Sequence, residues 1–414
     1  MKNLEQQGEA ARRAARVMMT ASTGQKNEAL AGMAQALLDE CADILAANQE
    51  DLEAARQGGM SEAMLDRLAL NEKRVQDMAE GIRQVQALPD PIGEIVEGSV
   101  RPNGLQVQKV RVPLGVIGMI YEARPNVTSD AAALCLKAGN VVILRGGKEA
   151  IRSNTAIVSA LSRGLEKAGL PAECVQLVGD TSRESATAMM RMSGVLDVLI
   201  PRGGAGLIKS VVENSRVPVI ETGVGNCHIF VDETADLKQA TDIVFNAKTS
   251  RPSVCNAAET LLVHEAVAQQ ALPQIAAKLA EKNVELRGCL RTCEILSQAV
   301  PAVESDWQDE FLDYILAVRV VRDLDEALAH IARYSTGHSE AIVTRDYESA
   351  MRFTREVDSA AVYVNASTRF TDGGELGLGA EIGISTQKLH ARGPMGVLTL
   401  TSTKHVILGN GQIR

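Results

Sequence analysis

The first 88 residues combine apolar and charged positions at helical spacing. Segments such as EAARRAARVMM and ALAGMAQALLDECADILAANQEDLEAAR repeat apolar side chains every three or four positions, which predicts several amphipathic helices. The pattern breaks at LPDPIGEIVEG, after which residues 105–113 alternate apolar and polar side chains. That alternation predicts a strand half exposed at the edge of a sheet.

From residue 112 to residue 231, runs that are apolar at every position alternate with helical segments. These runs are VPLGVIGMIY, NVVIL, CVQLV, VLDVLI, VPVI and CHIFV. Runs of this kind predict parallel strands that helices cover on both faces. A second series contains TLLVH, ILAVRVV, EAIVTRD and AVYVN. The sequence therefore predicts two doubly wound α/β units joined near residue 225, followed by a Gly-rich loop and a last strand over residues 397–408.

Composition narrows the class of protein. The chain has 414 residues, of which 45% are apolar and 23% charged, so it should fold into more than one domain. Its net charge of −9 has the wrong sign for binding a phosphate backbone, so nucleic acid is not an expected partner. No apolar stretch approaches the ~20 residues of a membrane helix, and the polar start resembles no secretion signal. We expect a cytoplasmic protein.

The segment RGGKEA, residues 145–150, lies between a predicted strand and a predicted helix. Backbone amides and the helix N-terminus at such a turn can hold a phosphate group. Arg145 and Lys148 flank Gly146 and Gly147 with positive charge, which favours the 2′-phosphate of NADP over the free ribose of NAD. We also assign the Gly203-Gly204 pair to the cofactor site. It is no P-loop, because Ile208 stands where that motif needs glycine.

Cys255 differs from the other cysteines in its surroundings. It lies in a polar loop, SRPSVCN, directly before a strand, whereas Cys135 and Cys174 lie inside apolar helix and strand patterns. Arg251 would favour either an anionic substrate or the Cys255 thiolate, the form that attacks carbonyl carbons. Cys289 and Cys293 have no second ligand pair nearby, so no metal site is expected.

Read together, these segments resemble the aldehyde dehydrogenase superfamily over nearly the whole chain. PLGVIGMIYEARPNVT is similar to the segment that carries the oxyanion-binding Asn, here Asn126. ETGVGNCHIFVD resembles the element that carries a Glu, here Glu221, and SVCN supplies the nucleophile Cys255. DEFLDYILAVRVV resembles the segment whose Glu binds the nicotinamide ribose, here Glu310. Lys148 occupies the position that is acidic in NAD enzymes.

Two further stretches, VRDLDEALAHIARYSTGHSEAI and VYVNASTRFTDGGELGLGAEIG, are similar to the branch that reduces acyl phosphates. This resemblance implies the reduction of L-glutamyl 5-phosphate by NADPH to L-glutamate 5-semialdehyde and phosphate, through a Cys255 thioester, in proline biosynthesis. Arg124, Arg202 and Arg251 are the candidate phosphate-binding residues, with the choice among them open. The role of Glu221 also stays open among a lost role, tuning of the cysteine and cofactor-dependent positioning.

The resemblance implies a domain organisation and partners. Residues 1–98 and 114–224 would form an NADP-binding domain, and residues 225–394 a catalytic domain. Residues 99–113 and 395–414 would form a small β flap through which the chain builds a homo-oligomer, because edge strands need covering. Glutamate 5-kinase would supply the acyl phosphate, and whether it docks on this protein is open.

Two alternatives remain. A hydrolytic, NAD-preferring aldehyde dehydrogenase would have the same fold, but Arg124, Lys148 and the segment HIARYSTGHSEAI argue against it. A cofactor-binding interaction protein without catalysis is the other alternative. The presence of both Cys255 and Asn126 at family positions argues against that one.

Overall fold

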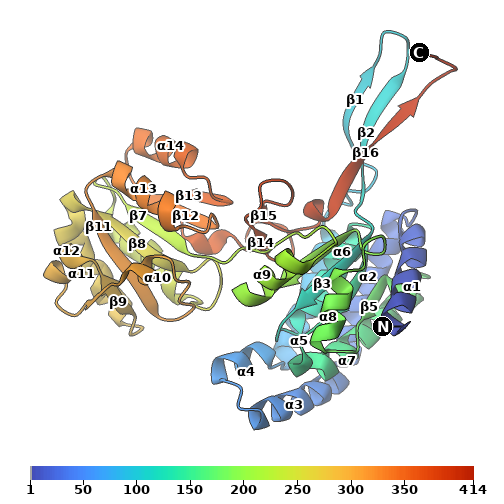
Figure 1. Ribbon diagram of the computed structural model, residues 1–414, viewed down its shortest axis with the longest axis horizontal. Helices are drawn as coiled ribbons and strands as arrows, with labels where there is room; N and C mark the ends of the chain where they lie inside the picture. The colour runs from blue at the N-terminus through green and yellow to red at the C-terminus, as the bar shows by residue number, and fades with distance from the viewer. Residues whose placement is uncertain (1) are drawn as a thin grey trace. The chain divides into compact units, whose positions relative to one another are not determined.

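The computed structural model describes residues 2–414, which divide into two compact units (Figure 1). Unit 1 contains the chain up to Thr222, with Gly377–Gly383 and Leu389–Arg414. Unit 2 contains Gly223–Leu376 and Ile384–Lys388. The predicted catalytic segment ran unbroken to residue 394, whereas residues 377–383 and 389–394 cluster with unit 1. The roles assigned to these segments stay predictions.

Unit 1 begins with helices, as the spacing of apolar residues predicts. They are α1 (Lys2–Met18), α2 (Thr23–Asp39), α3 (Cys41–Gln57), α4 (Glu62–Leu68) and α5 (Glu72–Ala87). Ser22 starts α2 with a capping box, in which its hydroxyl accepts from the Gln25 amide and the Gln25 side chain accepts from the Ser22 amide. Helix α2 packs closely on α7 (Ile151–Lys167), because Gly164 lets the Met33 backbone approach.

The sheet of unit 1 is parallel and has the strand order β5-β4-β3-β6. Its strands are β3 (Val116–Tyr121), β4 (Val141–Arg145), β5 (Val175–Leu177) and β6 (Val198–Arg202). The helices that follow strands β3, β5 and β6 are α6 (Asn126–Lys137), α8 (Arg183–Met190) and α9 (Ala205–Asn214), and short 3-10 turns η1 (Lys148–Ala150) and η2 (Ala172–Cys174) lie between elements. Every residue of β3 is buried, which explains its uninterrupted apolar run.

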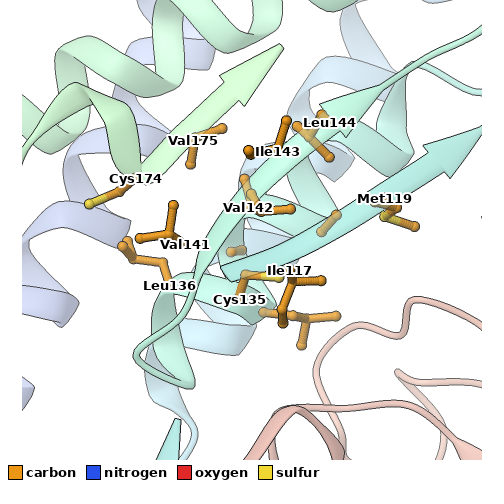
Figure 2. Packing of buried hydrophobic residues seen from close by; sticks show 14 of the residues in the cluster. Ile117, Met119, Cys135, Leu136, Val141, Val142, Ile143, Leu144, Cys174 and Val175 are labelled. Carbon is orange, nitrogen blue, oxygen red and sulfur yellow. The ribbon is translucent and has the colours of Figure 1, made fainter. Parts of the chain in front are cut away.

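Buried side chains of β3, β4 and β5 form one core with α6 (Figure 2). Cys135 and Cys174 belong to this core and are each 1% exposed, so their apolar sequence context predicted their burial correctly. The run VPVI was predicted as a strand, but it forms only an isolated bridge between Val219 and Leu199. Pro218 has no amide hydrogen to extend the pairing.

Unit 2 contains a seven-stranded parallel sheet with the order β10-β9-β11-β8-β7-β12-β13. Its strands are β7 (Cys227–Val231), β8 (Ala258–His264), β9 (Glu285–Gly288), β10 (Val300–Pro301), β11 (Ile315–Val321), β12 (Ser339–Val343) and β13 (Ala361–Val364). Its helices are α10 (Leu237–Thr249), α11 (Glu265–Ala280), α12 (Leu290–Ile295), α13 (Leu324–Tyr334) and α14 (Tyr347–Glu356), with 3-10 turns η3 (Glu304–Trp307) and η4 (Thr368–Phe370). The run CHIFV is β7 of this sheet and not, as its place in the first series suggested, a strand of the other. The short strands β9 and β10 were not predicted.

A separate three-stranded antiparallel sheet in unit 1 joins β1 (Ile95–Val100), β2 (Gln106–Pro113) and β16 (Thr401–Leu408). Strand β1 was missed because all six of its residues are exposed, so no face alternates. The predicted last strand started at residue 397, but a 3-10 turn, η5 (Leu398–Leu400), precedes β16. Two short strands, β14 (Ile384–Ser385) in unit 2 and β15 (Gly393–Pro394) in unit 1, complete the elements. Within residues 2–414, no helix combines the length and apolar character needed to span a membrane.

Candidate functional site

The predicted site residues fall into two groups by unit. Those in unit 1 are Arg124, Asn126, Arg145, Gly146, Gly147, Lys148, Arg202, Gly203, Gly204 and Glu221, and those in unit 2 are Arg251, Cys255 and Glu310. Most of the first group lie directly after the carboxyl ends of β3, β4 and β6, where ligands of open α/β sheets bind. Glu221 is partly buried in the irregular segment that precedes β7.

Cys255 lies in a tight turn between α10 and β8. The turn is closed by a hydrogen bond of 3.1 Å from the Ala257 amide to the Val254 carbonyl oxygen. The cysteine forms no disulfide with another described residue and is partly exposed. Arg251, four residues earlier, is exposed and has no hydrogen-bonding or ionic partner within residues 2–414. The thiol is therefore held on a short, defined turn with an uncommitted cation nearby in sequence.

Buried polar groups hold this turn from its C-terminal side. The Asn256 side chain donates to the Thr371 carbonyl oxygen at 2.7 Å, and the Asn256 carbonyl oxygen accepts from the Thr368 hydroxyl at 2.7 Å. Asn256 is 3% exposed, so water competes little for either bond. Neither threonine was picked out from the sequence, because they lie more than a hundred residues from Asn256.

Gly225 brings Cys255 and Glu310 together. Its amide donates to Oε1 of Glu310 at 2.8 Å. A Cβ atom on Gly225 would lie 1.5 Å from the Cys255 carbonyl oxygen, so the backbone of residue 225 touches the turn directly. The predicted nucleophile and the predicted ribose-binding carboxylate thus flank one glycine, whose importance the sequence alone did not indicate.

A buried ion pair supports the segment that carries Glu310. The Lys248 ammonium lies 2.6 Å from Oε2 of Glu259, and both side chains are fully buried. Oε1 of Glu259 accepts a hydrogen bond of 3.2 Å from the Leu312 amide, two residues after Glu310. Burial raises the pKa of Glu259 and lowers that of Lys248, with their mutual attraction opposing both shifts. The pair was not predicted, since charged residues are rarely fully buried.

Asn126 is the exposed first residue of α6, directly after the segment Arg124-Pro125. Its side-chain nitrogen donates to Oδ2 of Asp130 at 3.0 Å. Burial raises the pKa of Asp130 to about 6, against the opposing effects of the Asn126 hydrogen bond and the Arg202 charge. Asp130 is therefore hydrogen-bonded to one predicted site residue, Asn126, and influenced by the charge of another, Arg202.

Two carboxylates tie the loops at the edge of this sheet together. Oε1 of Glu149 accepts from the Ala123 amide at 2.8 Å, and Oε2 of Glu122 accepts from the Gly204 amide at 2.9 Å. Ala123 has a φ of +33°, an uncommon conformation for a residue with a side chain, and it directly precedes Arg124. The loops after β3, β4 and β6 are thus fixed to one another.

In the loop RGGKEA, the protein's own side chains pack closely against both glycines. A Cβ atom would lie 2.2 Å from Nδ2 of Asn154 at Gly146, and 2.0 Å from Oε1 of Glu149 at Gly147. Lys148 is exposed. Unlike Lys148, Arg145 is engaged within the protein. Its guanidinium donates to the carbonyl oxygens of Thr181 and Ser182 at 2.5 and 2.8 Å.

The start of α7 already has an anionic partner. Oδ2 of Asp51, from α3, accepts from the Ser153 amide at 2.8 Å and from the Ser153 hydroxyl at 2.7 Å, and Asp51 is 1% exposed. The amide of residue 153 at the start of α7 therefore already has an acceptor. This cap was not predicted, because Asp51 lies on a distant helix.

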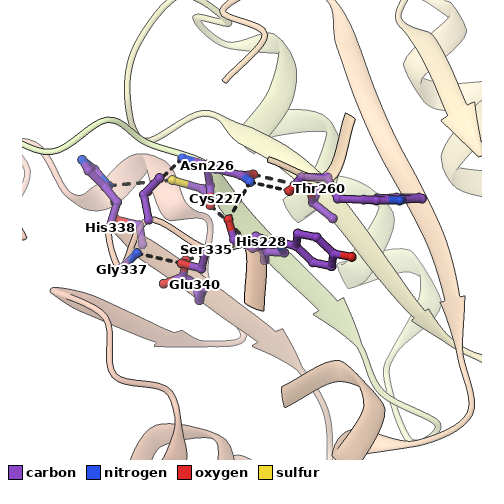
Figure 3. A network of polar contacts seen from close by, with 12 residues as sticks. Asn226, Cys227, His228, Thr260, Ser335, Gly337, His338 and Glu340 are labelled. Carbon is purple, nitrogen blue, oxygen red and sulfur yellow. Dashed lines mark hydrogen bonds and ion pairs between the residues drawn. The ribbon is translucent and has the colours of Figure 1, made fainter. Parts of the chain in front are cut away.

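Three buried histidines lie in unit 2 around the start of β7 (Figure 3). The centroid of the His330 ring lies 5.4, 5.5 and 4.6 Å from the ring centroids of His228, Trp307 and Tyr334, in edge-to-face or tilted arrangements. Burial lowers the pKa of His228 to about 4 and that of His330 to about 3, so both are neutral near pH 7. Within residues 2–414, no three His, Cys, Asp or Glu side chains are grouped as metal ligands would be.

Known proteins resemble this chain over its full length. The aldehyde dehydrogenase family model matches residues 2–287 and 287–380. Gamma-glutamyl phosphate reductase from Carboxydothermus hydrogenoformans is 63% identical over 404 residues, which cover 98% of this chain and 97% of that one. The enzyme of the same name from Clostridium botulinum is 60% identical, with both chains fully covered.

Solved structures agree. Gamma-glutamyl phosphate reductase from Thermotoga maritima superposes with a TM-score of 0.96 at 51% identity, and 99% of each chain is covered. An acetylating aldehyde dehydrogenase from Geobacillus thermoglucosidasius, 17% identical, shares the fold with a TM-score of 0.74. The chain belongs to the aldehyde dehydrogenase family and, within it, to the group of gamma-glutamyl phosphate reductases. The predicted α/β fold class and family resemblance are confirmed, and this family is one of oxidoreductases that use a nicotinamide cofactor.

Proposed function

We propose that the protein reduces L-glutamyl 5-phosphate to L-glutamate 5-semialdehyde with NADPH, releasing phosphate, as a step of proline biosynthesis. The observation that carries the proposal is Cys255, a partly exposed thiol on a clamped turn, in a chain 63% identical to an enzyme named for this substrate. A thiolate is the form of cysteine that attacks an acyl carbon.

The chemistry begins when the Cys255 thiolate adds to the acyl carbon of the substrate. The bond from that carbon to the phosphate oxygen then breaks, phosphate leaves with the electron pair, and Cys255 carries a thioester. Bound NADPH supplies the hydride that reduces this thioester. Cleavage of the carbon–sulfur bond then releases the semialdehyde and regenerates the Cys255 thiolate.

Both halves of the reaction place negative charge on the former carbonyl oxygen. We assign its stabilisation to the side-chain amide of Asn126 and the backbone N–H of Cys255. The Asn126 amide has two hydrogens, and Asp130 accepts only one of them, which leaves the second for the substrate. A donor of this kind is typically worth ~2.7 to 4 kcal/mol of barrier.

The phosphate of the substrate needs cations. Arg124, Arg202 and Arg251 are our candidates, because charge-assisted hydrogen bonds from guanidinium groups suit phosphate oxygens. Arg251 is the most readily available of the three, since it is exposed and uncommitted within residues 2–414. For Glu221 we propose no hydrolytic role, because water attacking the thioester would waste the acyl phosphate.

The residues around β4 suit a phosphorylated dinucleotide. The exposed Lys148 ammonium suits a ribose 2′-phosphate, and we keep Gly146 and Gly147 as members of this turn although the Asn154 and Glu149 side chains lie against them. Gly203 and Gly204, which we also assign to the cofactor, lie in the loop between β6 and α9. Glu310 uses Oε1 for the Gly225 amide, so its Oε2 is available to accept from a ribose hydroxyl.

Lys148→Glu should therefore weaken NADPH binding while sparing NADH. Loss of a charge-assisted bond and the added repulsion should raise the KM for NADPH about tenfold to hundredfold. Steady-state kinetics with both cofactors measure the effect. Lys167→Glu is the matched control, because Lys167 is exposed at the far end of α7. A KM for NADPH that stays within twofold of wild type would contradict the assignment of Lys148.

Phosphate dependence tests the function itself. When purified protein is given L-glutamate 5-semialdehyde and NADP, the reaction run backwards should form NADPH only after phosphate is added. The reason is that the thioester must be released by phosphate and not by water. NADPH formation without phosphate, with glutamate as the product, would instead support a hydrolytic aldehyde dehydrogenase.

We also propose a homo-oligomer that forms through the sheet of β1, β2 and β16, in a cytoplasmic protein supplied with acyl phosphate by glutamate 5-kinase. Strand β1 is an edge strand with Val100 70% exposed, and Ile407 on β16 is 61% exposed. Exposed apolar edges of this kind favour pairing with another chain.

A further inference from the structure

We propose that Cys227 is a positioning residue, whose buried thiol donates a hydrogen bond to the main-chain carbonyl oxygen of Cys255 and so fixes the turn that presents the nucleophile. The inference rests on the proposed function, in which Cys255 attacks the substrate. The Cys227 sulfur lies 3.1 Å from the Cys255 oxygen. Cys227 is the first residue of β7, and Cys255 lies just before β8, its neighbour in the sheet.

The Cys227 thiol is suited to act as a permanent donor. It is fully buried, and burial raises its pKa well above the usual value, so the sulfur keeps its proton at neutral pH. A thiol is a weak donor in water. In a site of low dielectric, however, the same bond is stronger, so its loss costs more free energy than it would in water.

The segment before Cys227 is a rigid support. The Asn226 side chain donates to the carbonyl oxygens of Trp307 and Tyr334 at 2.7 and 3.1 Å, and the Asn226 amide donates to the Thr336 hydroxyl at 3.1 Å. Asn226 is fully buried. These bonds fix the start of β7 to segments on either side of α13. Because Cys227 directly follows Asn226, they also restrict the position of its sulfur.

A histidine confines the Cys227 side chain from the other direction. Nδ1 of His338 lies 3.7 Å from the Cys227 sulfur and 3.0 Å from the Ser339 hydroxyl (Figure 3). His338 is fully buried. With the carbonyl on one side and the imidazole on the other, the thiol has one well-defined place, which a purely space-filling residue would not need.

The hydrogen bond from Cys227 sets the orientation of the turn that carries Cys255. The Cys255 carbonyl points inward to Cys227, while its own side chain remains partly exposed. Asn256 and the Ala257 amide, which lie after the nucleophile, also hold the turn. The Cys227 thiol contacts residue 255 itself, at its carbonyl oxygen.

Three variants test the inference. Cys227→Ala removes the donor, Cys227→Ser replaces the thiol with a hydroxyl donor, and Cys174→Ala is a control that removes a thiol of 1% exposure from unit 1. Hydrogen exchange of the peptide that contains Ala257 reports the stability of the turn without any substrate. Phosphate-dependent NADPH formation gives kcat and KM, and thermal unfolding shows whether each variant is folded.

We expect Cys227→Ala to speed exchange in the Ala257 peptide and to lower kcat, each about three- to tenfold, with KM nearly unchanged. Cys227→Ser should restore most of both, and Cys174→Ala should match wild type. Exchange and kcat of Cys227→Ala within twofold of wild type would overturn the inference, as would a serine variant no better than alanine. Wild-type protein without phosphate-dependent turnover would overturn the proposed function instead, and the exchange comparison would still decide the role of Cys227.

Discussion

Cys255→Ser should lower phosphate-dependent NADPH formation by at least about 10³-fold, as the loss of a covalent nucleophile does in other enzymes. A serine hydroxyl stays protonated near neutral pH, whereas a cysteine readily forms the nucleophilic thiolate. The substitution changes one atom on a partly exposed side chain, so the turn itself should persist. Initial rates with saturating semialdehyde, NADP and phosphate measure the effect.

Cys289→Ser is the matched control, because Cys289 is also a free, partly exposed thiol of unit 2 and has no assigned role. Its rate should stay within twofold of wild type. Iodoacetamide should label Cys255 in the wild-type protein preferentially near neutral pH. A Cys255→Ser protein that keeps a tenth of the wild-type rate would rule out the thioester mechanism.

Gly225→Ala should reduce the same rate about a hundredfold. The new Cβ atom would lie 1.5 Å from the Cys255 carbonyl oxygen, an impossible approach, and the atom it meets is backbone. The nucleophile turn must therefore shift, and a displacement of about 1 Å can cost about 10²-fold in rate. Overpacking should also lower the free energy of unfolding by ~1 to 3 kcal/mol.

Gly179→Ala provides the comparison for this substitution. No atom lies within 4 Å of a Cβ placed at Gly179, and its φ is not among the positive ones, so alanine should be accepted there with full activity. Enzyme rates and urea unfolding curves, measured for both variants, compare the losses of activity and stability. If Gly225→Ala is as active as Gly179→Ala, the close contact between Gly225 and the nucleophile turn has no functional importance.

The sequence predicted those parts of the fold in which local pattern and burial coincide. Strand β3 is buried at every residue and has an uninterrupted apolar run, so its place in a parallel sheet could be predicted. Strand β1 is exposed at every residue and shows no alternation, and β10 has only two residues. Their pairing depends on partners elsewhere in the chain, which a local pattern does not contain.

The same distinction applies to the candidate site. Cys255 could be selected because a polar loop before a strand is an unusual place for a cysteine, and the family resemblance agreed. The sequence could not single out Gly225, Cys227 or Glu259. Each contacts residues that are distant in sequence and come close only on folding: Gly225 and Cys227 contact the Cys255 carbonyl, and Glu259 contacts Lys248. Asp51, which caps α7 from α3, is a further example.

The pairing of β2 with β16 limits when this sheet can be completed as the chain folds during translation. Pro113 pairs with Thr401, and Gln106 with Leu408, so one side of β2 has its partner only when the last part of the chain has emerged from the ribosome. The parallel sheet of unit 1 is built from residues before 203 and can form much earlier. Late contacts between distant segments are slow to form. The nascent protein therefore carries an unprotected hairpin through most of its translation.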